Sequence, residues 1–253
     1  MTKEQIWETA QQSIRALMEK GGFAVLINES SDAVHTMSAH QPDSICCMDG
    51  RIAPHQSVIS VAGSGILIRD DVAAREHLVG FLREKKIKKV VLHEDCGAVG
   101  LYAKTKGISR ERADEEALEW ANELTALLGG VEPPSVLPVD TDFHNETCVY
   151  LELTDRFSLK GVVGFPPGFR VTVPAVSMTN ALAQVEVALN IAFAEYGFDN
   201  LFTRDTPFAV AIVAENQDDL RDMWKNADLT RLVERHGGRA VIDGFVLPTP
   251  AAI

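Results

Sequence analysis

The sequence has few cysteines and no long apolar run. Four cysteines occur in 253 residues. No apolar run reaches the length of a membrane-spanning helix, and the N-terminus lacks the pattern of a signal peptide. The sequence therefore predicts a cytoplasmic protein with no membrane partner. Thiols stay reduced in that compartment, so the cysteines are expected to be metal ligands or core residues rather than disulfides.

Basic charge is also scarce. The chain has 24 Lys and Arg against 36 Asp and Glu, a formal net charge of −12. A nucleic-acid partner needs clustered positive charge, which this balance argues against. The one basic cluster, residues 83–89, stands where a helix gives way to a strand and is typical of a solvated helix C-terminus. The expected substrate is a small molecule.

The pattern of apolar runs indicates an α/β protein. Apolar runs at 44–48, 58–62 and 89–92 predict strands, and the segments between them predict helices. Strands joined by helices favour a mostly parallel central sheet flanked by helices. Ligands bind such sheets beyond the carboxyl ends of the strands. We find no internal repeat and no linker, so residues 1–253 are interpreted as a single domain.

Other elements follow from periodicity and capping residues. An amphipathic N-terminal helix with Trp7 and Ile14 on its apolar face must cover either its own core or a neighbouring subunit. Further strands are expected at 23–27, 149–153, 208–213 and 240–247. Further helices are expected after Asp70 or Asp71, after Ser109, from 179 to 196 and from 218 to 235.

Two short motifs carry the chemistry: Cys47-Met48-Asp49-Gly50-Arg51 and His93-Glu94-Asp95-Cys96-Gly97. Each stands at the end of an apolar run. Cys47, His93 and Cys96 offer two thiolates and one imidazole, which suit Zn²⁺, and three protein ligands leave a fourth position open for water, as in catalytic zinc sites. A structural zinc is the alternative, but it needs a fourth ligand. Cys46 is expected to face the other side of the strand.

Asp49 and Arg51 extend the first motif. If the strand continues past Cys47, both side chains share its face because residues two apart point the same way. The guanidinium would keep Asp49 ionised, and the carboxylate could orient a zinc-activated water or bind the metal itself. A helix opening at Gly97 would stabilise the Cys96 thiolate, and Gly97 would let a substrate approach the backbone.

This pattern resembles the β-class carbonic anhydrases, whose motifs are Cys-x-Asp-Ser-Arg, then Ala-Gly, then His-x-x-Cys-Gly. The Ala-Gly pair corresponds here to Ala62 and Gly63. The resemblance covers about residues 44–99. It implies the β-carbonic-anhydrase fold, zinc bound by Cys47, His93 and Cys96, and reversible hydration of CO₂ to bicarbonate. It further implies Asp49 and Arg51 as catalytic residues, and Ala62, Gly63 and Gly97 beside the substrate. A homodimer or higher homo-oligomer with the site near the subunit interface is also implied.

The sequence departs from the family at three places. Gly50 replaces the usual Ser, Ser64 replaces the usual Asn, and residues around 130–205 have no placed counterpart. The substrate therefore stays open between CO₂ and carbonyl sulfide or carbon disulfide, and a non-catalytic zinc protein is a third alternative. Within that segment His144 and Cys148 could be a second metal pair or a proton relay, although a surface histidine and a core cysteine are favoured.

Overall fold

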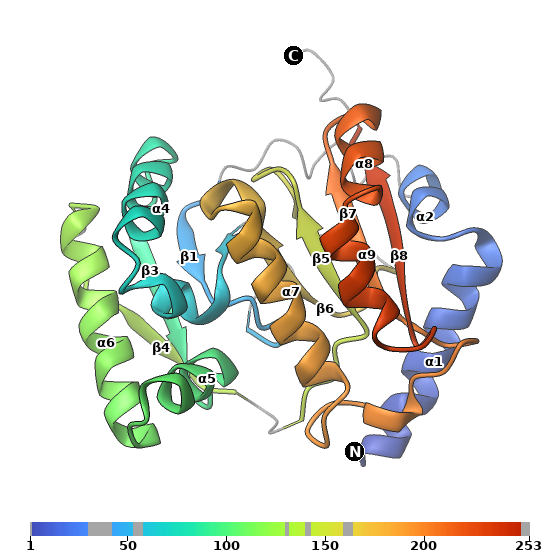
Figure 1. Ribbon diagram of the computed structural model, residues 1–253, viewed down its shortest axis with the longest axis horizontal. Helices are drawn as coiled ribbons and strands as arrows, with labels where there is room; N and C mark the ends of the chain where they lie inside the picture. Colours follow the sequence, from blue (N-terminus) through green and yellow to red (C-terminus); the bar gives the residue numbers. More distant parts are fainter. Residues whose placement is uncertain are drawn as a thin grey trace.

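The computed structural model of the chain describes residues 2–29, 42–52, 58–129, 132–139, 143–158 and 164–248. It has an α/β fold with two four-stranded sheets whose strand pairs are all parallel, flanked by helices (Figure 1). The expected α/β class with parallel strands is confirmed. The strands form two sheets instead of one central sheet. Among the described residues, none of the helices combines the length and apolar character needed to cross a membrane.

The first sheet has the order β2-β1-β3-β4 and the second the order β6-β5-β7-β8. The strands are β1 (Ser44–Cys46), β2 (Ile59–Ser60), β3 (Lys89–His93), β4 (Ser135–Leu137), β5 (Cys148–Glu152), β6 (Gly168–Thr172), β7 (Phe208–Ala214) and β8 (Ala240–Val246). The α-helices are α1 (Lys3–Lys20), α2 (Phe23–Glu29), α4 (Val72–Glu84), α5 (Gly97–Lys106), α6 (Arg110–Leu127), α7 (Met178–Ala192), α8 (Gln217–Trp224) and α9 (Ala227–Glu234). Short 3-10 segments are η1 (Ala62–Ile68), η2 (Val173–Ala175) and η3 (Asp199–Leu201).

The two sheets repeat one order of elements. We call residues 42–139 the first half and residues 143–248 the second half. In each half two strands are followed by a 3-10 segment and a helix, then a third strand, two helices and a fourth strand. In each sheet the second strand is at one edge, beside the first strand, and the third and fourth follow. The sequence analysis found no internal repeat, so the duplication is visible only in the topology.

The strands of the second sheet are apolar because both faces of the sheet are covered. Every residue of β5, β6 and β7 is buried. One face of this sheet packs with Leu17, Phe23 and Ile27 of the N-terminal helices, and the opposite face joins the core shared with the first half. Parallel strands covered on both faces have no polar face to present, so continuous apolar runs are expected.

The halves meet along their equivalent strands β2 and β6. The backbone N–H of Arg170 in β6 donates to the carbonyl of Met48 at 2.9 Å, and the backbone N–H of Ser60 in β2 donates to the Thr172 hydroxyl at 3.0 Å. Helix contacts are reciprocal across the junction. Helix α7 of the second half reaches η1 through Gln184, and helix α4 of the first half reaches η2 through His77. The two contacts differ in chemistry, since Gln184 accepts from a backbone N–H and His77 lies against a backbone carbonyl, but they join equivalent elements in both directions, as in a two-fold interface.

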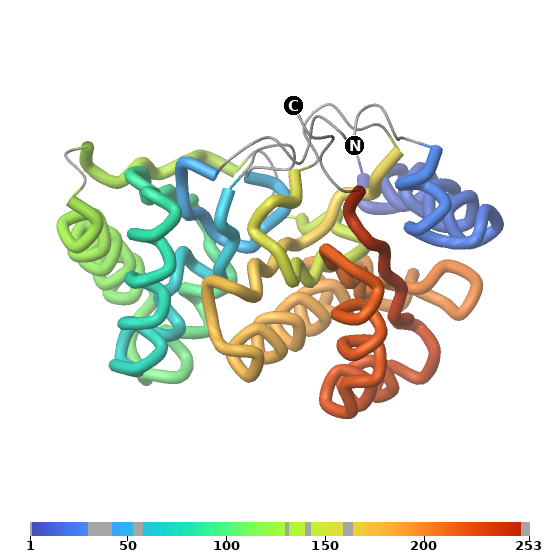
Figure 2. Tube along the Cα trace, turned by 90° about the horizontal axis from the view of Figure 1, so that it is seen from above, coloured from blue at the N-terminus to red at the C-terminus, as the bar shows by residue number. Residues whose placement is uncertain are grey.

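The N-terminal helix α1 covers the second half of its own chain, as Figure 2 shows from above. Trp7 packs against Phe198 and Phe202, with ring centroids 4.8 and 5.2 Å apart. The amphipathic pattern is confirmed, since Trp7, Ile14 and Leu17 are buried. The sequence analysis had left its own core and a neighbouring subunit as alternatives. In the structure it covers a part of the same chain that lies far away in sequence.

Two predicted elements are wrong. Residues 23–27 form helix α2 rather than a strand, because the backbone N–H of Phe23 is held by the Asp243 carboxylate and the segment packs as a helix on β8. The single helix expected at 218–235 is two helices, α8 and α9. Asn226 interrupts it by capping α9 with its side chain, which accepts from Asp228 and Leu229. The caps expected at Asp71 and Ser109 are confirmed.

Candidate metal centre

Cys47, His93 and Cys96 converge at the carboxyl ends of β1 and β3. Cys47 follows β1 directly, His93 is the last residue of β3, and Cys96 is the N-cap of α5. Their ligand atoms lie within 4.8 Å of one another, with the two sulfur atoms 3.7 Å apart, and all three residues are buried. The structure therefore brings together the three residues that the sequence singled out, in a group that could hold a metal ion.

The protonation of His93 suits a metal ligand. Its Nδ1 lies 2.7 Å from the Glu94 carbonyl, so Nδ1 carries the proton and Nε2 keeps its lone pair. Nε2 is buried and has no hydrogen-bond partner within the described residues. A buried polar atom without a partner is costly in a folded protein, and a cation at this position would satisfy it. Two thiols and a free imidazole nitrogen are a donor set that fits Zn²⁺.

The two thiols are coupled. The hydrogen bond between them raises the pKa of Cys47 and lowers the pKa of Cys96, because one sulfur keeps the proton while the other accepts it. A bound divalent cation stabilises both thiolates at once and removes this competition. Zinc binding should therefore release protons, and zinc affinity should fall as the pH falls.

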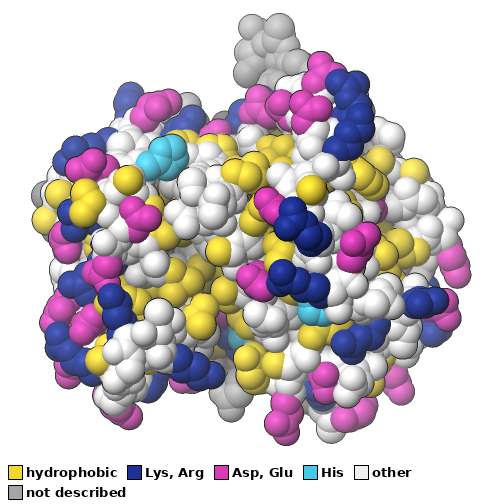
Figure 3. Space-filling view, in the orientation of Figure 1, with side chains coloured by type: hydrophobic (Ala, Val, Ile, Leu, Met, Phe, Trp, Pro, Cys, Tyr) yellow, Lys and Arg dark blue, Asp and Glu magenta, His cyan; other side chains and the backbone are white. Residues whose placement is uncertain are grey.

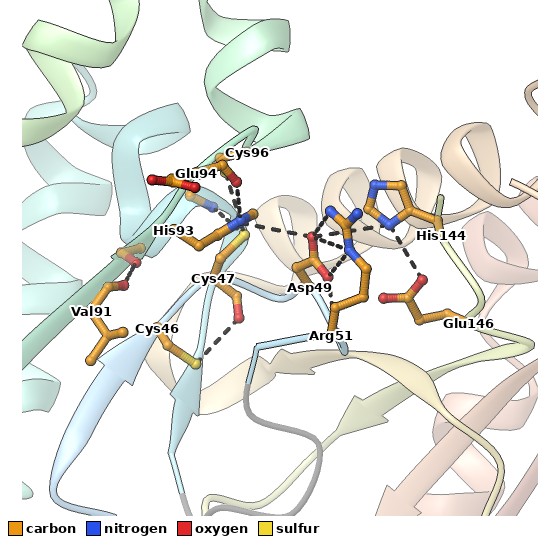
Figure 4. A network of polar contacts seen from close by, with 12 residues as sticks. Cys46, Cys47, Asp49, Arg51, Val91, His93, Glu94, Cys96, His144 and Glu146 are labelled. Atoms are coloured by element: carbon orange, nitrogen blue, oxygen red, sulfur yellow. Dashed lines mark hydrogen bonds and ion pairs between the residues drawn. The ribbon is translucent and has the colours of Figure 1, made fainter. Parts of the chain in front are cut away.

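Asp49 and Arg51 form a buried ion pair beside the thiols (Figure 4). Arg51 Nη2 lies 2.6 Å from Asp49 Oδ2, and the backbone N–H of Arg51 donates to Asp49 Oδ1 at 3.0 Å. Burial alone would raise the pKa of Asp49, but the hydrogen bonds from Arg51, together with the nearby charges of His144, Arg51 and His93, outweigh it and hold the pKa at about 2. Asp49 is therefore ionised at neutral pH. Its Oδ2 lies 3.8 Å from His93 Nε2.

The backbone conformation that brings Asp49 and Arg51 together differs from the expected strand. Strand β1 ends at Cys46, so Cys47, Asp49 and Arg51 do not alternate along one strand. Asp49 instead opens a turn in which its carboxylate accepts from the backbone two residues later, a common conformation of aspartate. The side chain of Arg51 folds back onto the same carboxylate. Cys46 lies apart from the trio, with its sulfur 3.9 Å from the Ser60 hydroxyl.

The three residues expected beside the substrate, Ala62, Gly63 and Gly97, lie in different surroundings. The backbone N–H of Gly63 donates to Cys47 Sγ at 3.1 Å, so this residue contacts a metal-ligand sulfur. Gly97 lines the cavities described below. Ala62 is fully buried, and its N–H donates to Gln184.

The departure at Gly50 has a tertiary cause. A Cβ atom on Gly50 would stand well inside van der Waals contact with the backbone carbonyl of Gly168 in β6. Any side chain at position 50 would therefore require the backbone of one half to shift.

Two residues outside the predicted site complete the cluster. His144 and Glu146 immediately precede β5, and Figure 4 shows Asp49 between them and the thiols. His144 Nδ1 lies 3.3 Å from Glu146 Oε2 and 4.0 Å from Asp49 Oδ2. Burial raises the pKa of Glu146, whose Oε1 has no hydrogen-bond partner within the described residues.

The expectation of a surface histidine at 144 is wrong. His144 is 6% exposed, because the chain entering β5 passes directly beside the first half. Cys148 is buried in the core as expected. The spacing of residues 142–148 drew attention to this segment, but nothing in the sequence indicated that it approaches Asp49.

Two connected cavities lie on the Asp49 side of the thiols. The inner cavity, about 10 Å³, is lined by Cys47 and Asp49 and by Phe169, Val187 and Ile191 of the second half. It shares Gly97, His144 and Ile191 with an outer pocket of about 660 Å³. In the space-filling view, apolar side chains gather in the hollow between α5 and α7 (Figure 3). The outer pocket also carries Arg51, Lys104 and Arg110.

A separate pocket of about 430 Å³ lies on the first half and is lined by all three candidate ligands together with Leu92, Val99 and Leu118. The candidate metal centre is therefore bordered by a wholly first-half pocket and by cavities that both halves build.

The second half offers no such donors at its equivalent positions. The residues that follow β5 as Cys47, Asp49 and Arg51 follow β1 are Leu153, Asp155 and Phe157. Ala214 ends β7 as His93 ends β3, and Asn216 caps α8 as Cys96 caps α5. Asp155 pairs with Lys85 at 2.7 Å. Among the described residues, two groups have metal-ligand geometry. One is Cys47, His93 and Cys96, the other is Asp49, His144 and Glu146, and both include residues of the first half.

Comparison of the chain with protein-family profiles, with curated proteins and with solved structures finds no match.

Proposed function

We propose that this protein is a zinc-dependent lyase that interconverts CO₂ and bicarbonate, similar in its site and fold to the β-class carbonic anhydrases. The observation that carries the proposal is the convergence of Cys47, His93 and Cys96 beside an ionised Asp49 held by Arg51. A Zn²⁺ ion held by these ligands lowers the pKa of a water toward about 7 and so supplies hydroxide at neutral pH.

Asp49 is suited to orient the nucleophile. Its pKa of about 2 makes it a hydrogen-bond acceptor throughout the physiological range. Arg51 occupies its carboxylate from one side and so fixes its direction. A hydroxyl group that donates its proton to Asp49 must point a lone pair elsewhere, toward the inner cavity. Orientation of this kind lowers the entropic part of the barrier.

The cavities suit an uncharged linear substrate and an anionic product. Phe169, Val187 and Ile191 give the inner cavity an apolar wall, which carries no group that must be desolvated when CO₂ binds. Arg51, Lys104 and Arg110 stand in the outer pocket beside Asp95. Arg51 and Arg110 are paired with Asp49 and Asp114, so an anion such as bicarbonate would meet Lys104 there. The inner cavity thus combines an apolar wall with the Asp49 carboxylate, and cationic side chains stand in the outer pocket.

Stopped-flow measurement of CO₂ hydration tests the proposal. Zinc-loaded protein should accelerate hydration between about pH 7 and 9, and a His93→Ala variant should give only the buffer rate. Absence of any acceleration in the wild-type protein, at confirmed zinc content, would contradict it.

Carbonyl sulfide and carbon disulfide are also linear and uncharged, so the apolar wall does not discriminate between them and CO₂ by charge. Sulfide release by the zinc-loaded protein, without CO₂ hydration, would favour that alternative. A zinc X-ray absorption spectrum that shows a fourth protein ligand, still bound at high pH, would favour a non-catalytic zinc protein. The cytoplasmic location stays a prediction, and the four cysteines are all free thiols in the structure.

The homodimer implied by the family resemblance also stays a prediction. Second-half residues of the same chain already stand beside the site, including His144 and Phe169. We therefore expect the site to be complete within one chain, whatever its oligomeric state.

A further inference from the structure

The segment that follows β2 holds an unusual backbone conformation against a candidate zinc ligand. Gly63, Ser64 and Gly65 have φ angles of +55°, +54° and +95° in succession. This conformation places the Gly63 N–H on Cys47 Sγ at 3.1 Å. A non-glycine residue in the left-handed region costs free energy and persists only when its surroundings hold it.

The backbone N–H of Ser64 closes this turn on the Val61 carbonyl at 2.8 Å, and three hydrogen bonds that involve side chains hold it from outside. The Ser64 hydroxyl donates to the Val91 carbonyl at 2.6 Å, and the indole N–H of Trp120 donates to the Ser64 carbonyl at 3.1 Å. Both partners belong to the first half. The third bond comes from the second half, where Oε1 of Gln184 in α7 accepts from the Ala62 N–H at 2.7 Å.

The third bond is isolated from solvent. Gln184 is 4% exposed and Ala62 is fully buried. Without the Gln184 oxygen, the Ala62 N–H would lack a partner in a place that water reaches poorly. A buried donor without a partner is costly, so the backbone would shift to find one. Gly63 is the next residue and would shift with it.

We propose that Gln184 is a positioning residue for the metal centre: through Ala62 it holds the Gly63 N–H on the Cys47 sulfur. The inference rests on the proposed role of Cys47 as a zinc ligand. A hydrogen bond to a ligating thiolate withdraws charge from the sulfur and fixes its direction toward the metal. The metal-free half of the chain thereby tunes the zinc site of the other half.

The equivalent contact in the reverse direction supports this assignment. His77 of α4 lies 3.1 Å from the carbonyl of Pro174 in η2, the 3-10 segment equivalent to η1. Each half therefore contacts the 3-10 segment of the other half from the helix that follows its own 3-10 segment: α7 contacts η1, and α4 contacts η2. Only the contact made by Gln184 leads on to a thiol, because Leu153 stands in the second half where Cys47 stands in the first.

Two variants of Gln184 and one control test the proposal. Gln184→Met keeps the length of the side chain but removes the acceptor, whereas Gln184→Glu keeps an oxygen at the same place. Thr172→Val removes two other hydrogen bonds at the junction: the one accepted from Ser60, two residues before Ala62, and the one donated to Glu152 Oε2. Zinc affinity is measured by chelator competition, and the sulfur-to-metal charge-transfer band is measured on the Co²⁺-substituted proteins.

Gln184→Met should weaken zinc binding about 10- to 100-fold, the usual effect of removing a group that orients a metal ligand. Its cobalt band should move to longer wavelength, because a thiolate without a hydrogen bond donates charge more readily. Gln184→Glu should retain the wild-type band. Thr172→Val should lower the denaturant midpoint but leave zinc affinity and the band unchanged.

An unchanged zinc affinity and band in Gln184→Met would overturn the proposal, as would an equal change in Thr172→Val. If Gln184→Met does not fold, Gln184→Asn supplies the same comparison, since it withdraws the acceptor by one methylene. Failure of the proposed function is a separate result, because it would appear as wild-type protein that binds no zinc or leaves CO₂ hydration at the buffer rate.

Discussion

The two halves of this chain share their order of elements and differ in what stands at the ends of their strands. The first half places Cys47, His93 and Cys96 beyond β1 and β3. The second half has Leu153, Ala214 and Asn216 at the equivalent positions. The same arrangement of strands and helices therefore supports the Cys47, His93 and Cys96 centre in the first half, whereas the described residues of the second half form no such group by themselves.

The difference shows that the scaffold and the chemistry are separable. Two parallel sheets of the same order require only apolar strands and capped helices, which both halves possess. The metal centre needs three particular side chains at strand and helix ends. The second half contributes to the site in another way, through the apolar wall formed by Phe169, Val187 and Ile191 and through the Gln184 contact.

The largest expected effect is the loss of bound zinc when a ligand in the first half is replaced, with no loss when a residue in the second half is replaced. His93→Ala should reduce bound zinc from one ion per chain to none and abolish CO₂ hydration, since two thiolates alone do not complete the site. Glu215→Gln, at the carboxyl end of β7 in the second half, should retain one zinc and full activity. Metal analysis of the purified proteins measures both. Two zinc ions per wild-type chain would break the comparison.

The next effect concerns the two equivalent aspartates. Asp49→Ala should keep zinc but lower CO₂ hydration by about 10²- to 10⁴-fold, because the nucleophile loses the acceptor that orients it. Asp155→Ala, in the second half, should leave the rate unchanged because Asp155 pairs with Lys85 and lines none of the cavities beside the thiols. Stopped-flow rates at fixed zinc content provide the measurement. Full activity in Asp49→Ala would refute the orienting role.

A third prediction concerns the junction between the halves. Arg170 Nε lies 2.6 Å from Glu152 Oε1, and both side chains are almost fully buried. Arg170→Met should destabilise the protein by about 3–5 kcal/mol, because it leaves the Glu152 carboxylate buried without its cation. The exposed pair Arg231–Asp228 is the control, and Arg231→Ala should cost about 0.5 kcal/mol or less. Urea unfolding measures the free energy of unfolding of both variants. A loss in Arg170→Met as small as the loss in Arg231→Ala would show that the junction pair contributes little to stability.

The smallest effect tests the close approach of the two halves at Gly50. Gly50→Ser should destabilise the protein by about 1–3 kcal/mol, since the new side chain meets the Gly168 backbone of β6. Gly80→Ala is the matched control, because a Cβ on Gly80 in helix α4 meets no atom within 4 Å. It should stabilise the protein by up to about 1 kcal/mol. A Gly50→Ser protein as stable as the wild type would contradict the close approach of the halves.

The local patterns of the sequence were sufficient for most elements and for the trio of ligands. Apolar runs indicated β1, β3, β7 and β8, and β1 and β7 are buried along their whole length, as strands covered on both faces are. Cys47, His93 and Cys96 could be found because each stands at a strand end, and strand ends of a parallel sheet converge. The pairing of Asp49 with Arg51 followed from their charges and their spacing of two residues, although a turn rather than a strand brings them together.

Tertiary structure alone decided how the two halves meet. Helix α2 was mistaken for a strand, because the Asp243 carboxylate that holds its first N–H is 220 residues away. The burial of His144, the exclusion of a side chain at Gly50 and the contact of Gln184 with Ala62 likewise join residues distant in sequence. Periodicity and spacing report only on neighbours along the chain. The approach of β6 to β2 depends on the packing of both sheets together, so it left no pattern that could be recognised beforehand.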